Sequence, residues 1–103
     1  MTTSAAVTAA GSTTADATVL SSWNNNITTA SAGQGVRWWG GVAGFSVFTV
    51  RNQTAVTVKL YPPSGGSILG YGADVGADIA VNATVFCFQT TTTNIACGEA
   101  PNI

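Results

Sequence analysis

The sequence predicts an all-β fold, a small antiparallel β-sandwich or barrel preceded by an extended N-terminal arm. The 103-residue chain is rich in valine and threonine and contains 9% aromatic residues. Such a composition suits the pleated, half-buried surface of a sheet. From residue 45 onward the apolar residues recur with a period of two, which is typical of strands. Turn-forming residues separate these runs at intervals of about 8–12 residues, as in sandwiches and barrels.

Residues 1–16 are almost entirely alanine, threonine, serine, glycine and valine. Because small side chains have little to pack, we expect an extended arm that becomes ordered only against a neighbour. Residues 17–103 are then expected to form a single β-domain. The N-terminus lacks the basic and strongly apolar regions of a signal peptide, and no apolar run is long enough to span a bilayer. The sequence therefore predicts a protein made in the cytoplasm that does not bind membranes.

The first expected strand spans residues 17–20. A short helical turn is an alternative over the next residues, because Val19, Trp23 and Ile27 also match a helical spacing. The asparagine run 24–26 disfavours that helix, since asparagine side chains compete for backbone hydrogen bonds. A glycine-rich loop is expected at residues 67–77. The remaining expected strands span residues 27–30, 36–39, 45–51, 56–61, 78–81, 83–89 and 94–97.

Several expected strands are apolar on both faces, because successive strand residues point in opposite directions. Trp38 and Trp39 therefore cannot share a face, nor can Phe86 and Cys87. One explanation is that a terminal segment folds over the outer face. The favoured explanation is that another copy of the chain or a larger partner covers it, since large exposed apolar patches mark interfaces. The candidate interface residues are Trp39, which precedes a flexible glycine pair, with Trp38, Phe48 and Trp23.

Only 7% of the residues are charged, against roughly 25% in ordinary globular domains. A free monomer normally uses surface charge to stay soluble, so this composition indicates a subunit of an assembly. The net charge of −1 with three scattered cations excludes a nucleic-acid partner, which needs clustered lysine and arginine. The charged residues are Arg37, Arg51, Lys59, Asp16, Asp74, Asp78 and Glu99.

The residue types argue against an enzyme. The chain has no histidine, so its serine and threonine hydroxyls lack the usual general base. Asp74 and Asp78 are spaced as on one helix face, but their glycine-rich context predicts a loop. Two cysteines without histidine do not make a metal site, and Gly65-Gly66 lacks the other residues of a phosphate-binding loop. We expect no catalytic residue, metal or cofactor.

Cys87 and Cys97 fall directly opposite each other if residues 90–94 form a hairpin loop. Opposed residues of an antiparallel pair approach the distance of a disulfide. The alternative is two reduced thiols, because free cysteines pack well in cores and a cytoplasmic origin favours the thiol form. The sequence does not decide between a disulfide and two reduced thiols.

Five stretches of the chain resemble a group of small structural proteins of tailed bacteriophages. They are residues 35–37 (GVR), 43–45 (AGF) with 50–52 (VRN), 58–68 (VKLYPPSGGSI) and 82–86 (NATVF). The resemblance extends over about residues 17–90 and consists of turns and strand edges. The chain departs from the group's pattern at Trp38-Trp39 and in its cysteine-containing hairpin.

This resemblance implies a capsid decoration, or cement, protein of the virion. Such a protein is made in the host cytoplasm, binds the outer surface of the major capsid protein shell as a homotrimer and stabilises it. The alternative is a tail- or fibre-associated virion protein whose exposed aromatic residues stack on a host-surface glycan. The number of copies in each particle would separate the two, and the resemblance implies no catalytic residue for either.

Overall fold

The computed structural model describes residues 4–20, 22–40 and 47–99, and these form nine strands and no helix. The all-β prediction is confirmed, and the helical turn considered near residues 19–27 is wrong because strand β3 runs through the asparagine run. The strands are β1 (Ser4–Thr8), β2 (Thr18–Leu20), β3 (Asn24–Thr29), β4 (Gly35–Trp38), β5 (Val47–Asn52), β6 (Val58–Tyr61), β7 (Ala77–Ile79), β8 (Thr84–Gln89) and β9 (Ile95–Glu99).

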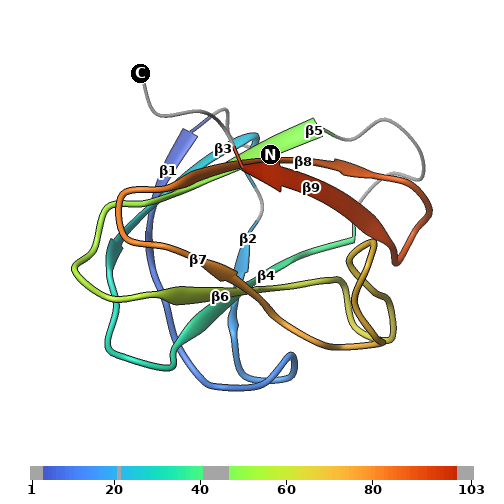
Figure 1. Ribbon diagram of the computed structural model, residues 1–103, viewed down its shortest axis with the longest axis horizontal. Helices are drawn as coiled ribbons and strands as arrows, with labels where there is room; N and C mark the ends of the chain where they lie inside the picture. Colours follow the sequence, from blue (N-terminus) through green and yellow to red (C-terminus); the bar gives the residue numbers. More distant parts are fainter. Residues whose placement is uncertain (1–3, 21, 41–46, 100–103) are drawn as a thin grey trace.

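The strands form two facing sheets (Figure 1). The five-stranded sheet has the order β1-β3-β5-β8-β9, and the four-stranded sheet has the order β2-β4-β6-β7. The expected antiparallel arrangement is wrong for four of the seven strand pairs, because β1–β3, β3–β5, β2–β4 and β4–β6 are parallel. The chain alternates between the sheets from β1 to β6. Two strands that are neighbours in one sheet are therefore connected through a strand of the other sheet, and they run parallel. In most proteins an α-helix makes such a connection between parallel strands; here a strand of the facing sheet makes it.

The expected N-terminal arm is not confirmed, because residues 4–8 form the edge strand β1 of the five-stranded sheet. β1 pairs with β3 of the same chain, from Ser4 opposite Asn24 to Thr8 opposite Thr29. Val7 and Ala9 are buried in the hydrophobic core. The small side chains therefore fit a thin edge of the sandwich, while residues 1–3 of the expected arm lie outside the described residues.

Residues 10–17, here called the covering segment, contact the four-stranded sheet at Gly35 and Tyr61. Ala10 exchanges two backbone hydrogen bonds with Gly35, at 3.1 and 3.2 Å. The Tyr61 hydroxyl donates to the Ser12 carbonyl at 2.8 Å, and the Tyr61 ring is buried although it lies on the outer face. An N-terminal segment thus covers Tyr61 on this sheet, but Trp39, which follows β4 of the same sheet, remains 45% exposed.

Asp16 holds the covering segment in its turn. One carboxylate oxygen accepts hydrogen bonds from the Thr13 hydroxyl and backbone N–H, both at 2.8 Å, and from the Ser12 N–H at 3.0 Å. These bonds, that of the Thr13 hydroxyl first, lower the pKa of Asp16. Because the folded pKa is lowered, the stabilisation is present at neutral pH and is lost as the pH falls through the acidic range.

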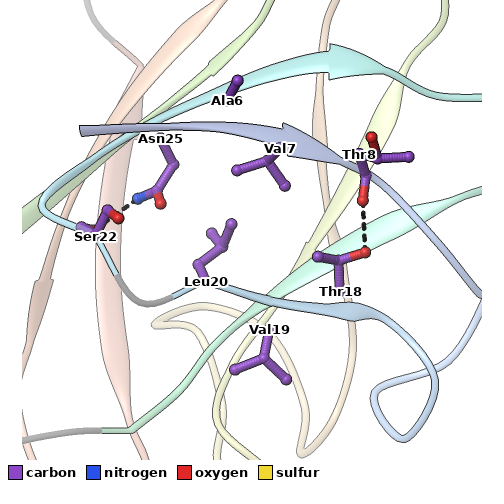
Figure 2. A pocket seen from close by; sticks show the side chains of 8 residues that line it. All are labelled: Ala6, Val7, Thr8, Thr18, Val19, Leu20, Ser22 and Asn25. Atoms are coloured by element: carbon purple, nitrogen blue, oxygen red, sulfur yellow. Dashed lines mark hydrogen bonds between the residues drawn. The ribbon is translucent and has the colours of Figure 1, made fainter. Parts of the chain in front are cut away.

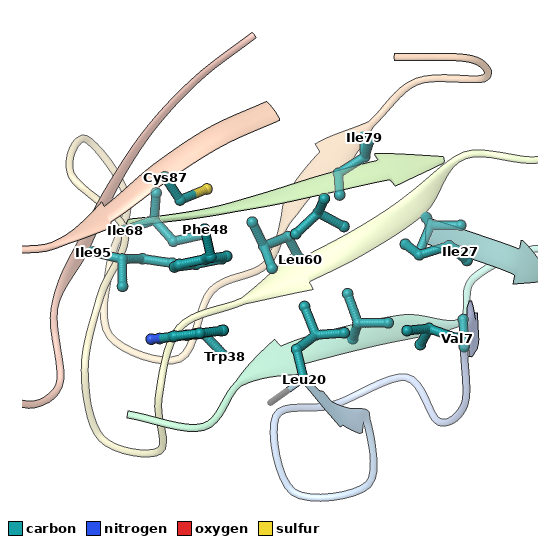
Figure 3. Packing of buried hydrophobic residues seen from close by; sticks show 14 of the residues in the cluster. Val7, Leu20, Ile27, Trp38, Phe48, Leu60, Ile68, Ile79, Cys87 and Ile95 are labelled. Carbon is teal, nitrogen blue, oxygen red and sulfur yellow. The ribbon is translucent and has the colours of Figure 1, made fainter. Parts of the chain in front are cut away.

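The core between the sheets centres on an aromatic stack (Figure 3). The Trp38 and Phe48 rings lie parallel with centroids 3.8 Å apart. Trp38 Nε1 donates to Gln89 Oε1 at 3.0 Å, and Gln89 Nε2 donates to the Gly40 carbonyl at 3.2 Å. Trp38 and Phe48 are 0% and 1% exposed, so the expectation that they anchor an interface is wrong. Strand alternation turns both inward, where each sheet contributes one ring.

A fully buried asparagine, Asn52, ties β5 to two turns. Its Nδ2 donates to the carbonyls of Val56 at 2.7 Å and Ile79 at 3.0 Å. Its Oδ1 accepts from the Thr54 N–H at 2.9 Å and hydroxyl at 2.7 Å. Both ends of the amide are therefore bonded inside the protein, as a buried polar group requires.

Replacing Asn52 with alanine is expected to lower the free energy of unfolding by about 2–3 kcal/mol, because it leaves buried carbonyls without a donor. Urea unfolding followed by circular dichroism measures the change. The control is Gln53→Ala, since Gln53 is exposed and its loss should cost less than about 0.5 kcal/mol. Equal stabilities of the two variants would contradict the structural role of Asn52.

Candidate interaction surface

The outer face of the five-stranded sheet exposes three large apolar side chains. Val47 on β5 is 58% exposed, and Phe86 and Phe88 on β8 are 53% and 50% exposed. Val47 lies directly opposite Phe88, and Thr49 lies opposite Phe86. We call Val47, Phe86 and Phe88 the outer apolar face. Their exposure confirms that β5 and β8 are apolar on both sides, since Phe48 and Cys87 point inward and are buried.

The neighbouring strand β9 does not cover these rings. Gly98 lies opposite Phe86 and Ala96 lies opposite Phe88, so β9 contributes only small groups beside the outer apolar face. The nearest described cation is at one end of the ladder, where Arg51 lies opposite Thr84 and approaches its hydroxyl at 3.4 Å. The centre of the outer apolar face is therefore uncharged, and its backbone is held by the pairing of β8 with β5 and β9.

The tryptophans divide between core and surface as alternation predicts. Trp38 is buried while the adjacent Trp39 is 45% exposed, with their rings edge to face and the centroids 6.3 Å apart. Trp23 is also exposed and precedes β3. Of the residues predicted at an interface, only Trp39 and Trp23 are thus accessible, whereas Phe86 and Phe88 were missed. The Phe-Cys-Phe alternation signalled them, because an inward Cys87 requires both rings to point outward. Phe45, with which the expected strand 45–51 begins, lies outside the described residues.

A disulfide joins Cys87 to Cys97 behind the outer apolar face. The two residues are directly opposed in the β8–β9 ladder, with Cα atoms 4.1 Å apart. The hairpin predicted at residues 90–94 is confirmed, since the Thr90 N–H donates to the Asn94 carbonyl at 2.9 Å. The covalent bond holds β9 against the strand that carries Phe86 and Phe88.

Replacing both cysteines with alanine is expected to lower the free energy of unfolding by about 2–3 kcal/mol, mainly because the unfolded chain loses a short closed loop. Urea unfolding of the natural chain with and without a reducing agent measures the same quantity. The double variant is the control, because its stability should not respond to the reductant. An equal response of both proteins would contradict a disulfide at this position.

The charged residues do not assemble a chemical site. Among the described residues no group of three or more metal-ligating side chains is found. Lys59 and Asp78 form an exposed ion pair at 2.6 Å, and the Asp78 carboxylate raises the pKa of Lys59. Exposed pairs of this kind contribute little to stability. The described residues contain no helix long and apolar enough to cross a membrane.

No family model, curated protein or solved structure matches the chain. The likeness to bacteriophage structural proteins therefore rests on the sequence motifs alone.

Proposed function

We propose that this protein is a bacteriophage capsid decoration protein that binds the outer surface of the major capsid protein shell and stabilises it. The observation that carries the proposal is the outer apolar face, two half-exposed phenylalanines and a valine on a rigid sheet. Aromatic side chains dominate the energetics of protein interfaces. A chain with so few charges is suited to having such a face covered.

The outer faces of the two sheets differ in how they are covered. The covering segment lies against part of the four-stranded sheet, where Ala10 bonds to Gly35 and Ser12 to Tyr61, while Val19 of the same sheet stays 48% exposed. The outer face of the five-stranded sheet presents Phe86 and Phe88 to solvent. A shell subunit would contact the outer apolar face, and Trp39, which follows β4 of the other sheet, adds a further exposed ring for a neighbouring copy in a homotrimer.

No step of this function requires a reaction. The protein contributes contact area, and bridging of adjacent shell subunits lowers the free energy of the intact particle. Because many identical copies act together, a modest gain at each site raises the temperature at which the particle opens. The function is thus mechanical stabilisation.

The test compares particles with and without the protein. We expect many copies over the capsid surface in an image reconstruction, and a higher temperature of genome release when the protein is bound. Identical release temperatures would contradict the proposal. A location confined to the tail would favour the alternative, in which the exposed aromatic residues contact a host-surface glycan.

Self-association is tested separately by sedimentation equilibrium. We expect a trimer at micromolar concentration, because large apolar side chains exposed side by side mark interaction sites. A stable monomer that does not aggregate would contradict the homotrimer.

A further inference from the structure

A pocket of about 290 Å³ lies where the edge strands β1 and β2 of the two sheets come together (Figure 2). We call it the edge pocket. The Thr18 hydroxyl bounds one end by donating to the Thr8 carbonyl at 2.6 Å. The buried side chains of Val7 and Leu20 point toward each other across it. None of the described residues that line the pocket is charged, so a ligand buried here should be neutral.

Asn25 supplies a polar group to this pocket. Its side chain is 1% exposed, and its Nδ2 donates to the carbonyls of Ser22 at 2.8 Å and Thr49 at 3.1 Å. These two bonds fix the orientation of the amide, because the reversed amide would place oxygen against two carbonyls. Asn25 Oδ1 is buried without a hydrogen-bond partner among the described residues. Figure 2 shows this oxygen turned toward the pocket and Leu20.

Such an acceptor requires a donor from outside the described residues. A buried polar atom without a partner destabilises the folded state, and structures rarely keep one without a reason. The oxygen itself has almost no accessible surface, so a donor reaches it only when a neighbouring side chain shifts. The edge pocket, at about 290 Å³, accommodates a group with an apolar part against Val7 and Leu20.

The backbone beside the pocket is a sheet edge, because β1 has no second neighbour among the described strands. The Ile27 carbonyl accepts a hydrogen bond from the Gln53 N–H, so Ile27 directs its backbone groups toward β5. Adjacent residues of a strand direct their N–H and C=O groups to opposite sides, so Asn26 directs its groups toward β1. In a parallel ladder these groups bond to the residues on either side of the partner, which is Ala6. Ala6 therefore directs its own N–H and C=O away from the sheet, along the edge.

We propose that an extended peptide segment of a partner protein adds as a strand beside β1 and inserts a neutral side chain into the edge pocket. The inserted side chain has an apolar stem and an N–H donor, as glutamine does, and donates to Asn25 Oδ1. Strand addition supplies affinity through the backbone and specificity through the pocket beneath it. The site is separate from the outer apolar face and does not depend on the proposed capsid function.

The experiment titrates the isotope-labelled full chain with capped hexapeptides of alternating threonine and valine, followed by amide chemical shifts. One peptide carries glutamine at a central position, and its matched control carries methionine there. We expect shifts in residues 4–8 and 18–20 and in the Asn25 side-chain amide. The methionine peptide should bind about tenfold more weakly, because it leaves the buried oxygen unpaired.

Two further measurements test the strand edge. Ala6→Pro removes an N–H that does not pair with β3, which an edge strand tolerates, and it should abolish binding while the melting temperature changes little. In case that variant fails to fold, the natural chain is titrated with the glutamine peptide methylated on its edge-facing amide nitrogens. This peptide should not bind.

Three results would overturn the proposal. Equal affinities of the glutamine and methionine peptides would show that Asn25 Oδ1 is not used. Binding of free propionamide as tight as that of the peptide would make the pocket a small-molecule site. The absence of shifts with every probe would mean that the pocket holds only water.

Discussion

A Trp38→Ala variant is expected to have a free energy of unfolding about 3–5 kcal/mol below that of the natural chain. Trp38 is fully buried and stacks on Phe48 with centroids 3.8 Å apart. It lies on β4 and Phe48 lies on β5, so the substitution removes the main aromatic contact between the two sheets. It also leaves Gln89 Oε1 without its donor. Since small domains are stable by only about 5–15 kcal/mol, urea unfolding followed by circular dichroism should show a large shift.

The matched control is Trp39→Ala, the same substitution one residue along the chain. Trp39 is 45% exposed, so its replacement should change the free energy of unfolding by less than about 1 kcal/mol. Removal of either tryptophan alters fluorescence, which is why a backbone signal is preferred. Equal losses in the two variants would contradict the division of this pair between core and surface.

The tryptophan pair also shows what the sequence could and could not predict. Alternation requires Trp38 and Trp39 to face opposite ways, and this is confirmed. It does not say which one faces inward, because that depends on the sheet that packs against β4. The partner, Phe48, lies on a strand of the other sheet. A period of two describes each strand separately and carries no information on sheet pairing.

The relative direction of the strands could not be predicted from the sequence for the same reason. Parallel and antiparallel strands share the period of two, so the positions of β6 and β8 could be predicted while the parallel pairing of β4 with β6 could not. The β8–β9 hairpin was predictable because a short loop brings adjacent strands together, and Cys87 indeed lies opposite Cys97.

The N-terminal region was misread because small side chains were taken as poor packing groups. Ala9 fills space in the core, and the backbone of Ala10 pairs with Gly35. Backbone hydrogen bonds do not depend on side-chain size, so composition gives no sign of them. The edge pocket was equally invisible, since the Asn25 amide acquires its fixed orientation only through carbonyls of Ser22 and Thr49.

Replacing both Phe86 and Phe88 with threonine is expected to weaken attachment to the capsid shell by about a hundredfold or more. Each central aromatic residue of an interface contributes about 2 kcal/mol or more when truncated, and about 1.4 kcal/mol corresponds to a factor of ten in affinity. Threonine keeps the strand propensity. Because both rings are half exposed in the isolated chain, its stability should change little.

The control for this double variant is Val81→Thr, which changes an exposed apolar residue in the turn after β7 and should leave attachment unchanged. Binding is measured by adding purified protein to particles that lack it and counting the copies retained. Natural binding by a folded double variant would mean that the outer apolar face is not the contact. If the double variant folds normally but no longer attaches to the particle, the two phenylalanines are needed for binding and not for folding. This is expected, because Phe86 and Phe88 lie outside the core that Trp38 stabilises. The two phenylalanines would then act in the assembly alone.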